Sequence, residues 1–338
     1  GTVNGAYGLT VAGNATLGGA VGGTAALTSL SVTGTSALNG GSVATSVNQT
    51  YGGAVTLGND ATLTSGAGGV IFVSTVDGAK ALTVNSTGAT LFNDAVGGAT
   101  ALTSLTTDAD GTTSLKSVRT TGAQTYNDAT TLNGTYASTD SAILFNAPVT
   151  LAGDSVVNAG YGTITFNGTV DGAKALTVNS TGAMQFYGSV GGTTALASLT
   201  SGSGYTSLVN VTTSGAQSYG GQTSLIGTYI TNNGAFGVTG PVTLAGDTVV
   251  STGSGNVTFA GTVDGAHIFT FGLVNGGRAL TVNSTGTTLF SGAVGGATAL
   301  ASLTTDAGGT TSLKSVRTTG TQTYNDATTL NGTYASTD

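Results

Sequence analysis

The chain has 338 residues, of which only 6% are charged, and its formal net charge is −7. It contains no cysteine and a single histidine, which excludes a disulfide framework, a thiolate metal site and a metal site with two histidines. Few cations and an acidic balance exclude an electrostatic footprint for nucleic acid.

Glycine is abundant, with 58 residues, and the frequent threonine, valine, tyrosine and phenylalanine favour extended chain over helix. No apolar run approaches the roughly 18 residues that a membrane-spanning helix requires. Composition therefore predicts an all-β protein built from short strands and many turns, with no transmembrane segment within these 338 residues.

In chain order, the first signal is a long internal repeat. The tetrapeptide TVNG begins at Thr2 and returns as TVDG at Thr75, Thr169 and Thr262, each copy leading into a VGG segment. The spacing of the complete units is about 94 residues. We expect one continuous segment of a longer protein, with long units at approximately 1–74, 75–168, 169–261 and 262–338, the last truncated.

Each long unit divides into smaller pieces of unequal length, which are separated by Gly, Asn and Asp turns. Within the pieces apolar residues alternate with polar ones, as where Leu82 and Val84 flank Thr83. A strand this short buries its apolar face only by stacking on equivalent strands. The pattern predicts a right-handed parallel β-helix (β-solenoid) with about 19 residues per turn. A β-sandwich is the weaker alternative, and a propeller needs blades of about 40 to 50 residues.

One irregularity interrupts the periodicity in the fourth unit. The third unit reads DGAKALTVNST, whereas the fourth reads DGAHIFTFGLVNGGRALTVNST, with the insertion at residues 267–278. Insertions in solenoids form loops on one face, often the binding face. The residues His267, Phe269, Phe271 and Arg278 are therefore a candidate ligand-contacting loop. A neutral decoration, or a short hairpin that covers a core edge, is the favoured interpretation.

The other polar positions fit turns better than chemistry. Asp108 and Asp110 form an acidic pair that the third unit replaces with TSGSGYT, which disfavours a catalytic or calcium site. The Asp-Gly of TVDG is a turn dipeptide. The tyrosine of QTY, such as Tyr126, is expected to fill the core or brace a corner. We therefore predict no catalytic, metal-binding or cofactor-binding residues and no enzyme activity.

The segment VGGATALTSLTTDADGTTSLKSVRTTGAQTYNDATTL, with variants in every unit, resembles repeats of large bacterial exoproteins of the filamentous-haemagglutinin type. These belong to the two-partner secretion and autotransporter-like adhesins, and the resemblance covers essentially the whole chain. It implies a β-helical rod that is extracellular or displayed on the bacterial cell surface. Adhesion, aggregation or biofilm structure is the implied role.

Duplication supports a structural role. Residues 111–140 recur at 309–338 with one change, Ala123 becoming Thr321. We expect a non-catalytic fibre that binds cell-surface or matrix glycans and proteins by weak multivalent contacts. The alternative is self-association into an extracellular filament, sheath or biofilm matrix.

Outward threonines suggest a minor third function. Ice-binding solenoids carry threonine ladders, and TLT at residues 62–64 and TIT at residues 163–165 fit such a ladder. Turns of unequal length are expected to disrupt its regularity.

Overall fold

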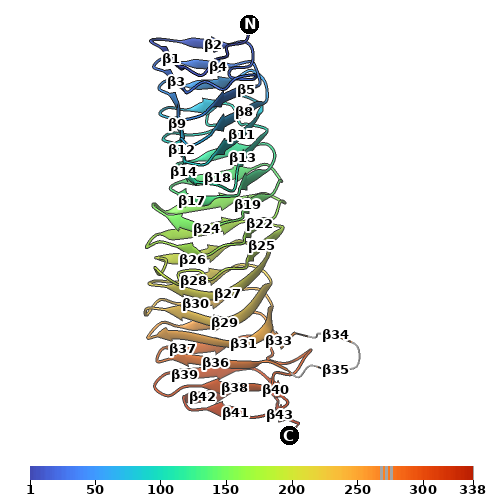
Figure 1. Ribbon diagram of the computed structural model, residues 1–338. Helices are drawn as coiled ribbons and strands as arrows, with labels where there is room; N and C mark the ends of the chain where they lie inside the picture. The colour runs from blue at the N-terminus through green and yellow to red at the C-terminus, as the bar shows by residue number, and fades with distance from the viewer. Residues whose placement is uncertain (267–268, 271–272, 275–276, 338) are drawn as a thin grey trace. The chain divides into compact units, whose positions relative to one another are not determined.

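The computed structural model describes residues 1–266, 269–270, 273–274 and 277–337. In this part of the chain the regular secondary structure is entirely β-strand. The fold is a right-handed parallel β-solenoid of about 15 turns, with about 21 residues per turn, which confirms the predicted fold class. The chain has two compact structural parts, residues 1–168 and 169–338, and in each the strands stack turn upon turn (Figure 1). From here on, "first unit" and "second unit" mean these two parts, and the sequence repeats are called long repeats.

Four runs of stacked parallel strands form the first unit. One run contains β1 (Gly8–Val11), β3 (Ser29–Val32), β6 (Gln49–Tyr51), β9 (Val70–Phe72), β12 (Ala89–Phe92), β14 (Thr112–Leu115), β17 (Ala129–Leu132) and β20 (Val149–Leu151). A second contains β5 (Ser42–Thr45), β8 (Ala61–Ser65), β11 (Ala81–Ser86), β13 (Ser104–Thr107), β16 (Gln124–Tyr126), β19 (Ile143–Phe145) and β22 (Ile164–Phe166). Two shorter runs contain β2 (Ala15–Leu17), β4 (Ser36–Leu38), β7 (Val55–Leu57) and β10 (Val76–Asp77), and β15 (Val118–Thr120), β18 (Thr135–Ser138) and β21 (Ser155–Asn158).

The second unit begins with β23 (Val170–Asp171) and has two long runs. One contains β24 (Ala175–Asn179), β26 (Ser198–Ser201), β28 (Gln217–Tyr219), β30 (Phe236–Val238), β32 (Val257–Phe259), β37 (Thr287–Phe290), β39 (Thr310–Leu313) and β42 (Ala327–Leu330). The other contains β25 (Ala183–Phe186), β27 (Tyr205–Thr213), β29 (Thr223–Thr231), β31 (Val242–Gly253) with β33 (Val263–Gly265), β36 (Ala279–Ser284), β38 (Ser302–Thr305) and β41 (Gln322–Tyr324). Two further pairs are β40 (Val316–Thr318) with β43 (Tyr334–Ser336) and the antiparallel hairpin β34 (Phe269–Thr270) with β35 (Leu273–Val274).

The turn is longer than predicted, with about 21 residues instead of about 19. With about 19 residues per turn, a long repeat of about 94 residues would contain five whole turns, but the longer turn fits fewer than five times into one repeat. Equivalent strands of successive repeats therefore lie in different sheets. In the second unit, ALTVN of β24 and ALTVN of β36 occupy different runs. The predicted boundaries of the long repeats are not tested by this geometry.

The core of each unit consists of inward side chains that stack on their equivalents one turn away. Tyr126, Phe145 and Phe166 are all at most 1% exposed. Their ring centroids are 5.0 Å and 4.7 Å apart along the column, with nearly parallel planes. Such stacked rings add to the burial of apolar surface and hold successive turns in register.

Candidate functional site

The predicted insertion loop is only partly described. Phe269 lies in β34, which pairs antiparallel with β35, whereas His267 and Phe271 lie outside the described residues. Arg278 directly precedes β36, and its carbonyl oxygen accepts a hydrogen bond from the N–H of Ala301 at 3.0 Å. A ligand-contacting role for this loop stays a prediction.

The aspartate of TVDG holds the VGG loop of the following turn. The Asp77 carboxylate accepts hydrogen bonds from the N–H groups of Ala99 and Thr100 at 2.8 and 2.9 Å. In the second unit Asp171 and Asp264 make the equivalent pairs of bonds. The aspartate therefore anchors a corner, which agrees with its interpretation as a turn residue.

Arginine holds the same loop through its carbonyl groups. Arg119 Nε donates to Gly97 O at 3.0 Å, and its Nη2 donates to Ala99 O at 3.3 Å. Arg317 repeats both bonds in the second unit, to Gly295 O and Ala297 O. The loop is thus bonded by a carboxylate at its N–H groups and by a guanidinium at its carbonyl groups.

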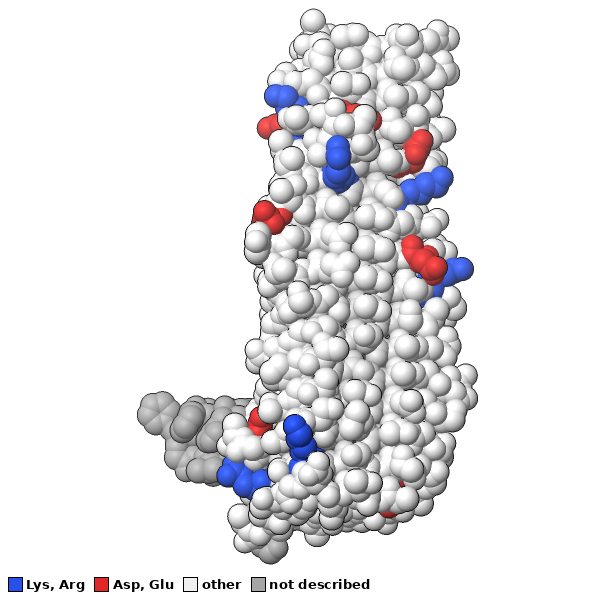
Figure 2. Space-filling view, turned by 180° about the vertical axis from the view of Figure 1, so that it is seen from behind, with Lys and Arg blue, Asp and Glu red and all other residues white. Residues whose placement is uncertain are grey.

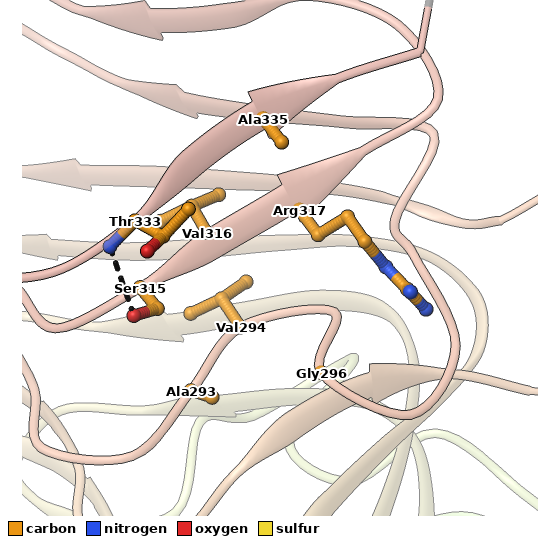
Figure 3. Close-up of a pocket in the computed structure, with 8 residues that line it drawn as sticks. All are labelled: Ala293, Val294, Gly296, Ser315, Val316, Arg317, Thr333 and Ala335. Atoms are coloured by element: carbon orange, nitrogen blue, oxygen red, sulfur yellow. Dashed lines mark hydrogen bonds between the residues drawn. The ribbon is translucent and has the colours of Figure 1, made fainter.

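A shallow hollow lies beside each of these arginines. The one at Arg317 has a volume of about 190 Å³ and is floored by Val294 and Val316 (Figure 3). Beside it the N–H of Thr333 donates to Ser315 Oγ at 3.2 Å. The lining contains neither a carboxylate nor a histidine, and the guanidinium already bonds backbone carbonyls. The hollow is large enough for a small molecule, but its lining residues include no acid, base or activated nucleophile.

Two aspartates in the first unit are wholly or partly shielded from solvent. Asp128 is 2% exposed and accepts hydrogen bonds from the hydroxyls of Thr107 and Thr113 at 3.0 and 2.6 Å. Asp108 accepts the N–H of Ser86 at 2.8 Å. Burial raises the pKa of both carboxyl groups. Asp110 is exposed, so Asp108 and Asp110 do not share one buried site, which agrees with their interpretation as turn residues.

The arrangement of Asp128 braces a corner rather than forming a metal centre. Among the described residues, no group of three or more His, Cys, Asp or Glu side chains is placed to hold a metal ion. The third repeat places Gly202 and Gly221 where the second has Asp108 and Asp128. Both carboxylates are thus replaced together, which is expected if they serve the same corner.

The QTY motif is internal, as predicted for its tyrosine. Tyr126 is fully buried and its hydroxyl donates to Gln124 Oε1 at 2.9 Å. Gln124 Nε2 donates in turn to Ala137 O at 2.8 Å. Burial raises the pKa of Tyr126 well above its ordinary value, and that of the half-buried Tyr324 to about 12. The buried Tyr126 is therefore not available to a ligand such as a sugar.

The outward side of the run from β5 to β22 carries a regular polar surface. Its central positions pair directly from strand to strand and form what we call the threonine column: Ser42, Thr62, Thr83, Thr106, Thr125, Leu144 and Thr165. Two positions further along the chain lies a second row, here called the asparagine column: Thr64, Asn85, Asp108, Asn127, Asn146 and Asn167. It begins one turn later than the threonine column, because the residue that pairs with Thr64 in the preceding turn is Ala44. Together they make a two-column polar face.

Unequal turns do not break this face, contrary to the sequence-based expectation. Thr106 pairs with Thr83 on one side and with Thr125 on the other, although the turn before Thr106 is longer than the turn after it. The additional residues are accommodated in the VGG loop that Asp77 and Arg119 hold. The pattern Thr-x-Asn was visible in the sequence, but its irregular spacing concealed that the copies align.

The described residues include no helix with the length and apolarity needed to cross a bilayer. Comparison with protein-family models, with curated proteins and with solved structures found no match to this chain. The resemblance to filamentous-haemagglutinin-type exoproteins therefore stays a prediction.

Proposed function

We propose that this protein is a non-catalytic, repetitive fibre, secreted or displayed on a bacterial cell surface, that mediates adhesion or aggregation. The observation that supports the proposal is the in-register display of polar side chains on stacked turns. Thr62, Thr83 and Thr106 represent this display, because each pairs directly with the next. The solenoid presents the same chemistry many times along one direction.

Such a surface favours many weak contacts over one tight site. The outward positions Thr62, Thr83 and Thr106 carry short polar side chains, while the large aromatic residues Tyr126, Phe145 and Phe166 are buried. A single contact of this kind is weak, but linked contacts add through effective concentration. The partners that suit it are glycans or proteins of cell surfaces and matrices, which offer repeated polar groups of their own.

Retention under flow tests this proposal. Beads carrying the purified chain at increasing density are passed over immobilised matrix glycoprotein or intact cells, with uncoated beads as the control. We expect retention to rise more steeply than density, because contacts act together. Retention that is strictly proportional to density, or that saturates at one tight site per chain, contradicts the mechanism.

Self-assembly into a filament, sheath or matrix is the second candidate. The observation that favours it is the scarcity of charge: only 6% of the residues are charged, and Figure 2 shows few charged side chains on the face in view. Solenoids with little charge can approach laterally without strong repulsion. Electron microscopy of the native surface separates the two candidates, since isolated stalks support the adhesin and ordered bundles support the filament.

A further inference from the structure

The two-column face of the first unit has a geometry that a generic adhesive surface does not require. Six of the seven members of the threonine column carry a hydroxyl group, and Leu144 is the exception. Stacked parallel strands place successive members of the threonine column about 4.8 Å apart. In the asparagine column Thr64 and Asn85 lie within their strands, and Asp108, Asn127, Asn146 and Asn167 directly follow theirs. The threonine column is therefore a row of nearly constant spacing, with a second polar row beside it.

The array is rigid as well as regular. Threonine is β-branched and has few χ1 rotamers, so its hydroxyl and methyl groups hold fixed positions on a strand. In the asparagine column, Asn146 Nδ2 donates to Asn127 Oδ1 at 2.6 Å, and Asn167 Nδ2 donates to Asn146 Oδ1 at 2.7 Å. These amides orient one another, which lowers the entropy lost when a partner orders on them.

The chemistry of the face disfavours partners that bind through charge or through large apolar anchors. None of the seven strands that carry the threonine column contains a charged residue, and the one carboxylate of the asparagine column, Asp108, bonds the N–H of Ser86. The most exposed large apolar residues of the first unit, Tyr7 and Tyr161, lie outside these strands. Nucleic acids and acidic glycans require cations, and protein interfaces rely on aromatic or apolar anchors. The face offers mainly hydroxyl, methyl and amide groups.

An ordered water lattice is the partner that such a face fits. Water bridges polar groups at little enthalpic cost, and a lattice lets single weak contacts add along the whole column. Ice also repeats at a distance close to the separation of stacked strands, so matching positions stay matched over several turns. We propose that the two-column face of the first unit, from Ser42 to Asn167, binds ice.

The second unit carries a shorter version of the same feature. Thr281, Thr304 and Thr323 pair in succession across β36, β38 and β41. The preceding member is Val249, which pairs with Thr281 although the insertion falls between them in the chain. The hydroxyl array is thus interrupted at Val249, and we assign the principal ice-binding face to the first unit.

Matched substitutions test the proposal on the full chain. Thr106 and Thr131 are both half-buried, outward third residues of four-residue strands, but Thr131 lies on β17 in a different run. We expect the unaltered protein to produce thermal hysteresis and to inhibit ice recrystallisation. Thr106→Lys is expected to lose both activities, because a long charged side chain lifts the lattice off the middle of the face. Thr131→Lys is expected to retain them.

Three results would overturn the assignment. The first is an unaltered chain without thermal hysteresis or inhibition of recrystallisation. The second is equal loss of activity in both lysine variants while circular dichroism and melting show that both are folded. The third is sedimentation of the unaltered chain as a dimer that Thr106→Lys dissociates, because a second copy would then cover the face. None of these readouts depends on bead retention, so the adhesive proposal can fail or succeed separately.

Discussion

The stacked column of Tyr126, Phe145 and Phe166 allows a quantitative test of what holds successive turns together. Phe145 is 1% exposed and lies between two rings whose centroids are 5.0 and 4.7 Å away. Phe145→Ala removes the buried ring and leaves a cavity that the stacked backbones close poorly. Substitutions of this kind cost about 3–5 kcal/mol, and the two lost ring contacts account for about 0.5–1.5 kcal/mol each within that total.

Urea denaturation followed by circular dichroism measures the cost, with Leu144→Ala as the control. Leu144 is the adjacent outward residue and only partly buried, so its truncation is expected to cost less than about 1 kcal/mol. Because solenoid turns contact only their neighbours, hydrogen exchange should accelerate in β16, β19 and β22 and remain unchanged in the more distant β3 and β6. Equal costs for both variants, or uniform acceleration along the chain, would refute the stacked-core argument.

Three further predictions concern the corners. Gly97 has φ of 69° and an added Cβ would lie 2.1 Å from Arg119 O, so Gly97→Ala should cost about 1–3 kcal/mol in urea denaturation. Gly237→Ala, where a Cβ meets nothing within 4 Å, should not. Arg119→Thr loses two hydrogen bonds to carbonyl groups, so the free energy of unfolding should fall by about 1 kcal/mol and the melting temperature should fall with it. Burial raises the folded-state pKa of Asp128 above its unfolded-state value of about 4. The free energy of unfolding should therefore fall as the pH rises from the unfolded-state pKa through the raised folded-state pKa. Asp128→Asn should flatten part of this dependence, and an unchanged pH profile would contradict it.

Periodicity and turn chemistry were sufficient to predict the fold class. Leu82 and Val84 flank Thr83, and the structure buries the first two and leaves the third partly exposed. Alternation determines which face of a strand is apolar, and short strands bury that face only by stacking. The buried position of Tyr126 followed from the same reasoning, because one tyrosine in each long repeat makes a poor external row.

The length of each turn, and with it the candidate face, was decided only by the tertiary structure. The loops between strands differ in their number of residues, and the strands still pair in register. Thr106 therefore aligns with both Thr83 and Thr125, although the two intervening turns contain different numbers of residues. Local sequence determines where a strand occurs, but hydrogen bonding between turns determines which strands become neighbours. The alignment of hydroxyl groups into a column, and the burial of Asp128 beneath a corner, arise from that long-range pairing.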